Sequence, residues 1–327
     1  MKFLQIGLGS MGKRRIRNLL YHKIPAQDIF GFDLSKDRAQ EVKEKYKVTT
    51  FTDFTQADNE VNPNAYIIST PPHLHAKYFL HAAKNKKHFF TEVATTNDGY
   101  DKLLKLLDNN FVAAPSCSYR FYEPIKQLQK LIENNKIGQI QAFTHHMGQY
   151  LPDWHPWENI KDFYVSKPES SACREMVPFE LNWLQWVIND QVTLAKGFTE
   201  TKLSLSIKTK DTYAATLKTK NNIIGTLLVD VISRAPFRTL RILGTEGVLE
   251  WHWQQYLIKI YSSPSQKWTE VKLDKGKKIK GYKTTTEEMY EDEIAAFLDA
   301  ISGKKSFPYT FKEDNHNFFI LKMIEDK

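Results

Sequence analysis

The feature that most constrains the fold is a glycine pattern near the start of the chain, between a short apolar run and a helix-forming run. Residues 3–6 (Phe-Leu-Gln-Ile) precede Gly7, Gly9 and Gly12, which form a Gly-x-Gly-x-x-Gly pattern, and residues 13–21 follow. In dinucleotide-binding folds the first glycine permits a tight turn, the second lets the backbone approach a pyrophosphate, and the third lets the helix pack on the strand. The helix's unpaired amides then face the phosphates. The pattern therefore predicts a strand, a turn and a helix that bind a dinucleotide.

An acidic residue at the end of the next apolar run bears on which dinucleotide binds. Residues 29–32 (Ile-Phe-Gly-Phe) end at Asp33. A carboxylate at this point accepts hydrogen bonds from ribose hydroxyls and repels a 2′-phosphate, so we expect NAD. Lys36 and Arg38 follow closely and weaken this repulsion, which leaves NADP as the alternative. A glycine-rich turn that binds nothing is the less favoured interpretation, because strand, helix, second strand and acid occur in register.

The first third of the chain alternates between apolar runs and helical patterns. Pro71 and Pro72 stop one of the apolar runs, and proline cannot continue a parallel ladder, so the chain turns at the carboxyl end of that strand, where open sheets bind ligands. Further strands are expected at 48–51, 65–70, 88–92 and 111–114, and helices at 36–46, 75–85 and 97–108. This alternation predicts a doubly wound parallel sheet, and we assign residues 1–118 to an NAD(P)-binding Rossmann domain.

The rest of the chain, residues 119–327, follows a different pattern. Helices are expected at 124–134, 171–188, 287–301 and 314–325, and a first strand at 139–147. Period-2 segments follow one another without helices at 193–199, 202–208, 212–219, 223–232, 238–243, 248–253 and 257–261. Such a series predicts a large, mostly antiparallel open sheet with one covered face. The fold class is therefore α/β, with a second α/β domain for substrate binding and oligomerisation, and we expect a cleft between the two domains.

Composition restricts the class of protein. The two cysteines, Cys117 and Cys173, form neither a disulfide framework nor a Cys-x-x-Cys pair, and no apolar run is long enough to cross a bilayer. The net charge is +8, yet no nucleic-acid-binding motif accompanies it, so we favour a phosphate-bearing small substrate over nucleic acid. The sequence enters its first strand with no signal region. We therefore expect a soluble cytoplasmic protein without membrane or nucleic-acid partners.

Several segments resemble the glucose–fructose oxidoreductase / inositol dehydrogenase / rhizopine-catabolism (Gfo/Idh/MocA) family over nearly the whole chain. The segments are the glycine turn, Ser69 to His75, Lys87 to Glu92, Tyr119 to Phe121, Lys136 to Gly138, Arg238 to Gly247 and Tyr290 to Glu293. The loop 148–154 resembles members found among surface-polysaccharide sugar biosynthesis enzymes. The resemblance implies an NAD(P)-dependent oxidoreductase acting on one carbinol or keto carbon of a polyol, sugar or nucleotide sugar. It also implies a homodimer or homotetramer through the C-terminal sheet.

By position, the family resemblance implies a set of cofactor-binding residues in the first domain. These are Gly7, Gly9, Ser10, Met11, Gly12, Asp33, Ser69, Thr70, Pro71, His75 and Glu92.

The catalytic positions depart from the family pattern. Members usually have Glu-Lys-Pro after the fourth strand, whereas this chain has Glu92-Val93-Ala94, and valine cannot handle a proton. The later signature with a histidine and an aspartate is also changed, with Phe179 and Asn182 at those positions. The chain is thus a variant that lacks the lysine, and the usual lysine, histidine and aspartate chemistry does not carry over.

Other side chains must therefore move the proton and hold the substrate. The catalytic candidates are Glu175, Tyr119 and Glu180, and the substrate-binding candidates are Arg120, Tyr150, Trp154, Arg174 and Phe179. A tyrosine hydroxyl or a glutamate can exchange a proton, a guanidinium binds carboxylate or phosphate, and tryptophan stacks on sugar rings. Glu175 and Glu180 are five residues apart on one helix, so they diverge.

Structural roles remain open for several of these candidates. Glu180 is equally a paired carboxylate, Arg120 a buried ion-pair partner, and Trp154 a packing anchor. His145 and His146 are adjacent on a strand and point to opposite faces, so they cannot bind one metal ion together, and we expect no metal site.

Three functions are compatible with the sequence. The first is an NAD-dependent oxidoreductase of a sugar or nucleotide sugar that uses Glu175 or a tyrosine in place of lysine and histidine. The second is a bilin-type reductase, an architecture that also lacks the lysine. The third is a cofactor-binding sensor or partner protein without catalysis.

Overall fold

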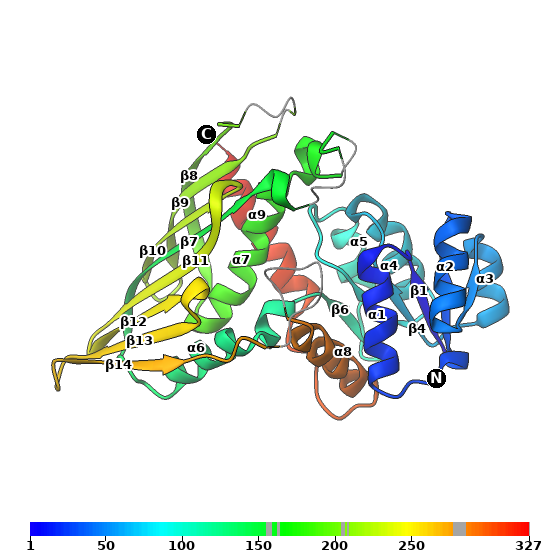
Figure 1. Cartoon of the computed structure of the whole chain (residues 1–327), viewed down its shortest axis with the longest axis horizontal. Coiled ribbons are helices and arrows are strands. Elements are labelled where there is room, and N and C mark those ends of the chain that lie inside the picture. The colour runs from blue at the N-terminus through cyan, green and yellow to red at the C-terminus, as the bar shows by residue number, and fades with distance from the viewer. Residues whose placement is uncertain (155–158, 162–163, 204–206, 208, 277–285, 327) are drawn as a thin grey trace. The chain divides into compact units, whose positions relative to one another are not determined.

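The chain forms two compact units in the computed structural model. The structure describes residues 1–154, 159–161, 164–203, 207, 209–276 and 286–326. The first unit contains Met1–Ser118 and Glu287–Asn315, and the second contains Tyr119–Thr286 and His316–Lys327. The sequence pattern predicts a single domain for all residues after Ser118. Glu287–Asn315 packs with the first unit instead, through long-range contacts that local sequence patterns do not encode (Figure 1).

The first unit is built on a six-stranded parallel sheet with the order β3-β2-β1-β4-β5-β6. Its strands are β1 (Phe3–Ile6), β2 (Ile29–Phe32), β3 (Thr49–Phe51), β4 (Ala65–Ile68), β5 (His88–Thr91) and β6 (Ala113–Pro115). Its helices are α1 (Ser10–Tyr21), α2 (Lys36–Tyr46), α3 (Phe54–Val61), α4 (His75–Lys84), α5 (Tyr100–Leu106) and α8 (Glu288–Ile301). The predicted doubly wound Rossmann sheet is confirmed, because strands and helices alternate and every strand pairing in this sheet is parallel.

Burial explains why this sheet could be predicted from short apolar runs. All four residues of β1 and of β4 are buried, as expected for parallel strands covered by helices on both faces. A cluster of aromatic rings, Phe79, Phe89 and Tyr100 with Phe311, packs beside α4 and α5. Gln5 is the exception in β1, because it is a fully buried amide in an apolar strand.

The second unit is built on an eight-stranded sheet with the order β14-β13-β12-β11-β7-β10-β9-β8. Its strands are β7 (Ile140–Tyr150), β8 (Val192–Glu200), β9 (Thr212–Thr219), β10 (Ile224–Asp230), β11 (Ile232–Gly244), β12 (Gly247–His252), β13 (Leu257–Ser262) and β14 (Lys267–Lys272). Only the pairing of β10 with β7 is parallel among the described strands of this sheet, so the predicted mostly antiparallel sheet is confirmed.

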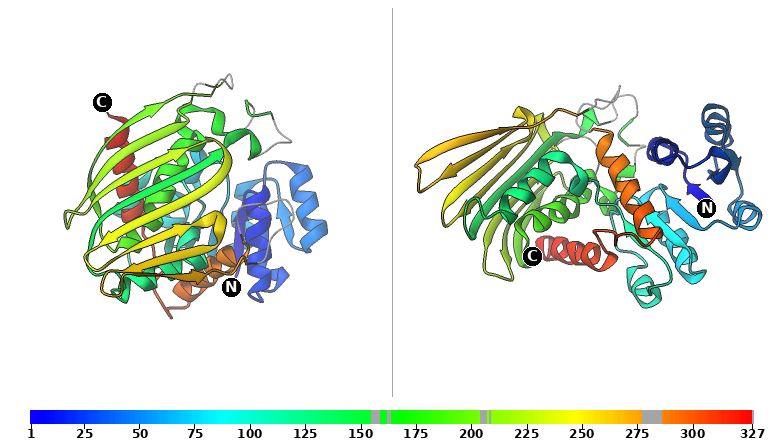
Figure 2. Two further views of the ribbon diagram at one scale, coloured as in Figure 1. Left: turned by 60° about the vertical axis from the view of Figure 1, so that its left-hand side comes forward. Right: turned by 90° about the horizontal axis from the view of Figure 1, so that it is seen from below.

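Helices cover one face of this sheet. They are α6 (Glu123–Glu133), α7 (Ala172–Ile188) and α9 (Phe311–Glu325), and Figure 2 (left) looks onto the opposite face. Residues alternate accordingly: in β7, Phe143, His145 and Met147 are buried toward the helices, whereas Thr144 and His146 lie on the opposite face. We call that opposite face the open face.

Two details of the second sheet differ from the sequence-based expectation. Strand β14 was not predicted, because its exposed sequence Lys-Trp-Thr-Glu-Val-Lys lacks the apolar alternation of a half-buried strand. Of the strand expected at 202–208, residues 202, 203 and 207 lie outside any strand, and 204–206 and 208 lie outside the described residues. Among the described helices, none is long and apolar enough to cross a membrane.

Candidate functional site

Of the three glycines in the glycine turn, Gly9 is the one that neither the backbone conformation nor the packing of the protein requires. Gly7 has φ +87°, and a Cβ there would lie 2.6 Å from the Ser69 carbonyl oxygen. A Cβ on Gly12 would lie 1.9 Å from the Gly7 carbonyl oxygen. By contrast, Gly9 has φ −69°, which any residue adopts, and a Cβ there would meet no atom within 4 Å. The space that Gly9 leaves open is therefore not filled by the protein, as expected where a backbone must approach a ligand.

The start of α1 is suited to a negatively charged ligand. Gly9 is the N-cap and makes no side-chain capping hydrogen bond, and the first turn contains no acidic residue. The first amides of a helix have no intrahelical acceptor and carry the positive end of its dipole. Ser10 and Met11 in this turn are exposed and half-buried, respectively. A pyrophosphate here would supply the acceptors that the helix lacks.

The Asp33 carboxylate is fixed beside the glycine turn. Its Oδ2 accepts a hydrogen bond from the Leu8 amide at 2.7 Å, and its Oδ1 accepts one from the Ser35 amide at 2.9 Å. The Arg38 guanidinium lies 3.9 Å from Oδ2 with a mostly exposed side chain. The carboxylate is thus oriented for ribose hydroxyls, and a cation stands close enough to moderate its repulsion of a 2′-phosphate.

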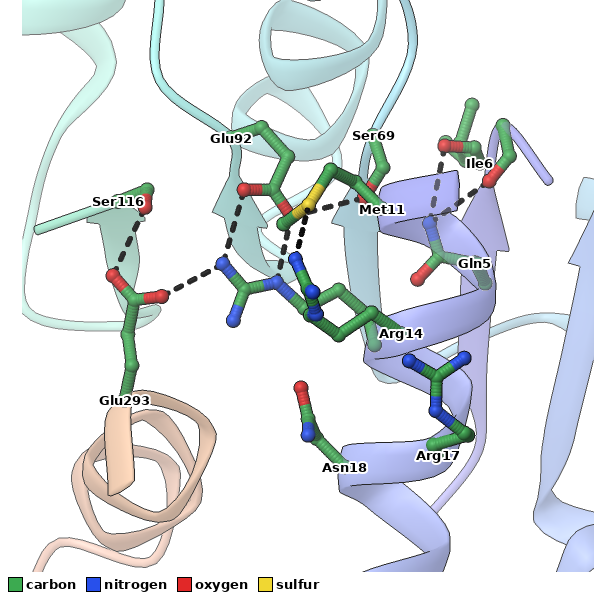
Figure 3. A network of polar contacts seen from close by, with 12 residues as sticks. Gln5, Ile6, Met11, Arg14, Arg17, Asn18, Ser69, Glu92, Ser116 and Glu293 are labelled. Atoms are coloured by element: carbon green, nitrogen blue, oxygen red, sulfur yellow. Dashed lines mark hydrogen bonds and ion pairs between the residues drawn. The ribbon is translucent and has the colours of Figure 1, made fainter. Parts of the chain in front are cut away.

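At the carboxyl ends of β4 and β5, a buried arginine holds the candidate Glu92 (Figure 3). Arg15 Nε and Nη2 donate to the two Glu92 oxygens at 2.6 and 3.0 Å, and Ser69 Oγ donates to Glu92 Oε1 at 3.2 Å. Arg15 is fully buried and lies over the Phe90 ring at 4.5 Å. Glu92 is therefore held in one orientation at the sheet edge where ligands bind in such folds.

The same arginine also binds a carboxylate from α8. Arg15 Nη2 lies 2.7 Å from Glu293, whose other oxygen accepts hydrogen bonds from Ser116 Oγ and the Cys117 amide. Burial raises the pKa of Glu293, and Arg15 opposes this shift. The sequence does not predict the pairing of Arg15 with Glu293. Arg15 lies in a run of basic residues that is typical of an exposed helix face, and its partner Glu293 is remote in the chain.

His75 is neutral, and one of its ring nitrogens has no hydrogen-bond partner in the part of the chain that the structure describes. Burial lowers its pKa to about 4, so at neutral pH the ring carries one proton. Nε2 lies 2.8 Å from the Thr70 carbonyl oxygen and must hold that proton, which leaves Nδ1 as an acceptor. Among the described residues, neither Nδ1 nor the buried Thr70 Oγ1 has a hydrogen-bond partner. Such buried groups are satisfied when a ligand or water binds beside them, next to the chain turn at Pro71.

Gln5 is hydrogen-bonded to the glycine turn, and it is not among the site residues that the sequence predicts. Its Nε2 donates to the carbonyl oxygens of Gly7 at 3.1 Å and Ile6 at 3.3 Å. The same nitrogen would lie 3.2 Å from a Cβ on Gly12. The sequence signal was a lone amide in a fully apolar parallel strand, where a polar side chain needs a structural reason.

Two catalytic candidates of the second unit, Tyr119 and Glu180, belong to one buried network. Arg238 Nη1 donates to the Tyr119 oxygen at 2.6 Å, and Arg238 Nε donates to Glu180 Oε1 at 2.8 Å. His145 Nε2 and Trp183 Nε1 lie 2.8 and 2.9 Å from Glu180 Oε2. Burial disfavours a charge on Glu180, but Arg238 and His145 outweigh it and lower its pKa to about 2. Glu180 is therefore a fully buried, ionised partner of these groups.

Glu175 and Glu180 diverge, as their spacing predicts. Glu175 is half-buried in the first turn of α7, whereas Glu180 lies inside the unit. Arg174, next to Glu175, binds Glu325 of α9 through two hydrogen bonds of 2.8 and 3.2 Å. Tyr213 donates to the same carboxylate at 3.1 Å. A substrate anion would have to displace Glu325 to use Arg174.

The remaining substrate-binding candidates also make contacts within the second unit. Arg120 is buried and donates from Nε to Asn182 Oδ1 at 2.9 Å, and Phe179 packs edge-on against Tyr119. The Arg234 guanidinium lies 3.9 Å from the Tyr150 ring centroid. The half-buried Trp154 has an indole nitrogen without a hydrogen-bond partner among the described residues. Packing thus explains Arg120 and Phe179 better than it explains Trp154.

The two histidines of β7 lie on opposite faces of the sheet. His145 faces Glu180, and His146 Nε2 lies 2.8 Å from Asp230 on the open face. In the described part of the chain, no group of three or more histidine, cysteine or carboxylate residues is arranged to hold a metal ion.

A comparison with known proteins agrees with this architecture. Residues 1–113 match the oxidoreductase family with an NAD-binding Rossmann fold, and residues 125–250 match the GFO/IDH/MocA C-terminal domain. The chain therefore belongs to the GFO/IDH/MocA family of oxidoreductases, and its first unit is an NAD-binding Rossmann domain. The lysine-lacking variant and the individual site residues remain predictions.

Several individual relatives are named as dehydrogenases. A levoglucosan dehydrogenase of Pseudarthrobacter phenanthrenivorans is 33% identical over 90 residues, which is 27% of this chain and 22% of that protein. A structure of levoglucosan dehydrogenase with NADH and levoglucosan is 18% identical, with a TM-score of 0.83 over 99% of this chain and 96% of that one.

Two further solved structures share the fold. A myo-inositol 2-dehydrogenase from Lactobacillus plantarum is 18% identical, with a TM-score of 0.78 over 98% of this chain and 95% of that one. An oxidoreductase from Agrobacterium radiobacter in complex with NAD+, L-tartaric acid and magnesium is 14% identical, with a TM-score of 0.85 over 98% and 94%. At these identities the likeness shows the fold.

Proposed function

We propose that this protein is an NAD-dependent dehydrogenase or reductase acting on a carbinol or keto group of a sugar or nucleotide sugar. The observation that carries the proposal is the open space at Gly9 beside the uncapped start of α1. Asp33 lies at the other side of the turn, hydrogen-bonded to the Leu8 amide. Together these features match the three contacts that a Rossmann domain makes with NAD: backbone approach, pyrophosphate binding and ribose binding. NADP is the alternative cofactor because of Arg38.

Different residues of the chain would bind different parts of this cofactor. The glycine turn and the first amides of α1 would bind the pyrophosphate, Asp33 the ribose, and Ser69, Thr70, Pro71, His75 and Glu92 the remainder. Bound NAD supplies the hydride acceptor. Oxidation of an alcohol also releases a proton, which a side chain must accept, and Val93 cannot do so. We therefore propose Tyr119 or Glu175 for this step.

Three features support a sugar-like substrate. Relatives of this fold include proteins named for levoglucosan and myo-inositol, both polyhydroxylated rings. The second unit offers Tyr150 and Trp154, whose rings suit the apolar faces of sugars while their polar atoms bond hydroxyls. The net charge of +8 suits a phosphate-bearing sugar. A nucleotide sugar of surface-polysaccharide biosynthesis, suggested by loop 148–154, is the finer form of this proposal.

We also propose that two copies of the chain meet through the open face, as a homodimer or as part of a homotetramer. Across the strands, one register row of this face is almost wholly apolar, and four of its side chains are 38–47% exposed: Leu194, Ile224, Leu243 and Trp268. Tyr261 packs beside Trp268 in the same row. A contiguous exposed apolar row on a monomer is typical of an interaction surface, and a two-fold contact would bury it against itself.

Substitution of Gly9 tests cofactor binding without disturbing the fold. Because a Cβ at this position meets no protein atom, Gly9→Ala should retain the melting temperature and lose at least about tenfold in NAD affinity, measured by NADH fluorescence titration. Gly12→Ala is the contrasting variant, since its Cβ meets the Gly7 carbonyl and should lower the melting temperature. Equal NAD affinity of Gly9→Ala and the natural chain would contradict the proposed binding mode.

Turnover tests the rest of the proposal. NADH formation or consumption should be followed with a panel of sugars, cyclic polyols and nucleotide sugars. NAD binding without hydride exchange on any of them, even at high enzyme concentration, would favour the non-catalytic alternative. An absorbance change with a linear tetrapyrrole would instead favour the bilin-type reductase.

A further inference from the structure

We propose that Tyr78 is a further cofactor-binding residue, whose hydroxyl hydrogen-bonds the adenine-side ribose of NAD together with Asp33. Tyr78 lies in the first turn of α4, outside the glycine turn and outside the set of site residues that the sequence predicts. The inference rests on the proposed dehydrogenase function and adds to it a contact at the end of the cofactor that does not react.

The ring of Tyr78 lies at the carboxyl ends of two strands. Its centroid is 6.4 Å from that of Phe32, the last residue of β2, and 5.1 Å from that of Phe54, the first residue of α3 after β3. Helical side chains lean toward the N-terminus of their helix, and α4 begins after β4 has ended, so the ring leans toward the same edge of the sheet. Asp33 directly follows Phe32. Tyr78 therefore lies beside the acid that a Rossmann fold offers to the ribose.

The Tyr78 hydroxyl has no hydrogen-bond partner among the described residues. Tyr78 is only 4% exposed, yet its oxygen is not sealed in the interior, unlike the unpartnered atoms of Thr70 and His75. A buried tyrosine ring normally has a partner for its hydroxyl. A ligand bound at this edge of the sheet would supply that partner.

The hydroxyl and the Asp33 carboxylate have complementary hydrogen-bonding capacity. Burial raises the pKa of Tyr78, and the negative charge of Asp33 raises it further, so the phenol is neutral at neutral pH and can donate. Asp33 can only accept. A ribose hydroxyl placed between them would donate its proton to Asp33 and accept a hydrogen bond from Tyr78. The two side chains together would satisfy both the hydrogen and a lone pair of one ribose hydroxyl.

The residues that follow β2 leave room for adenosine. Leu34, next to Asp33, is 77% exposed, and the Arg38 side chain is 59% exposed. An adenine ring bound against Leu34 would remove apolar surface from water, which favours binding at this end of the sheet. The ribose would then lie at Asp33, within reach of the groups that surround this acid.

A second tyrosine in the same aromatic cluster provides a matched comparison. Tyr66 of β4 is 2% exposed and packs beside His81, which also packs on Phe54. The Tyr66 hydroxyl donates to the Asp58 carboxylate, so its hydrogen-bonding capacity is already used within the first unit. The two buried phenols thus differ in whether the described protein itself supplies a partner.

Calorimetric titration with NADH tests the assignment on the full-length protein. Tyr78→Phe removes only the hydroxyl, so the melting temperature of the free protein should be unchanged or higher, while NADH should bind about three- to tenfold more weakly through loss of one hydrogen bond. Tyr66→Phe should do the opposite, with a lower melting temperature, because Asp58 loses a donor, and with the NADH affinity of the natural chain. Equal NADH affinity of Tyr78→Phe and the natural chain would overturn the proposal.

Cofactor fragments and analogues locate the contact. ADP-ribose, which lacks the nicotinamide, should show the same loss in Tyr78→Phe as NADH does. Of the two NAD analogues that lack the 2′- or the 3′-hydroxyl of the adenine-side ribose, one should bind the variant and the natural chain equally, because the partner of Tyr78 is already absent. The same loss with both analogues as with NAD would overturn the ribose contact. Failure of the proposed function would look different, because the natural chain itself would then bind neither NADH nor ADP-ribose.

Discussion

The two units contain two buried ionic networks that differ in their ratio of carboxylates to basic side chains. In the first unit, two carboxylates, Glu92 and Glu293, share the single cation Arg15. In the second unit, Arg238 and His145 share the single carboxylate Glu180. The pKa of Glu293 is raised, mainly by burial, whereas the pKa of Glu180 is lowered to about 2 in spite of burial. The direction of the pKa shift of a buried carboxyl thus follows the ratio of basic side chains to carboxylates around it, rather than its depth.

The largest expected effect is the loss of stability when Arg15, the single cation of the first network, is replaced. Arg15→Met leaves the fully buried Glu293 and the partly buried Glu92 without their shared cation and should lower the free energy of unfolding by about 3–5 kcal/mol, measured by urea denaturation. Arg241→Ala is the matched control, because its ion pair with Glu250 is half exposed and contributes at most about 1 kcal/mol. Similar losses in the two variants would show that Arg15 is not the charge that holds these carboxylates.

The pH dependence of stability should have opposite sign in the two networks. The depressed pKa of Glu180 contributes stability that is present above its usual pKa of 4.5 and is lost as pH falls toward about 2, on the order of 3 kcal/mol in total. The raised pKa of Glu293 acts in reverse, so its contribution falls as pH rises through the usual value. In Glu180→Gln, the urea midpoint should therefore no longer decline toward acid pH. In Glu293→Gln, the urea midpoint at neutral pH should be higher than in Glu180→Gln. Parallel profiles for the two variants would refute the comparison.

A partly exposed pair gives the smallest expected effect. Arg174 and Glu325 form a bidentate ion pair like that of Arg15 and Glu92, but their side chains are 21% and 28% exposed. Arg174→Ala should lower the free energy of unfolding by about 1 kcal/mol or less, because solvent screens the pair. Thermal denaturation would check this. A loss as large as that of Arg15→Met would mean that geometry matters more than burial.

Most of the first unit could be predicted because its signals are local. The glycine turn, the acid Asp33 and the prolines after β4 each stand at a strand end, and the buried strands read as apolar runs. The second sheet was also predicted from its period of two, apart from β14, whose exposed residues carry no alternation.

The polar interior could not be predicted in the same way. Arg15 and Arg238 have the composition of surface residues, and only the partners Glu293 and Glu180, remote in the chain, make their burial favourable. Tyr119 and Glu180 were named separately as candidates, and the sequence gives no sign that Arg238 joins them. The packing of α8 in the first unit is likewise a long-range property. Pairings of this kind depend on tertiary distances that neither periodicity nor spacing contains.

Gly12 and Arg15 are on one short helix, with less than one turn between them. The backbone amides that face the phosphates and the Arg15 guanidinium therefore move together whenever α1 moves. A substitution that changes cofactor preference by moving α1 would also disturb the ion pairs of Arg15. Redesign of cofactor preference is better directed at Asp33 and Arg38 after β2, whose contacts are with the Leu8 and Ser35 amides and with each other.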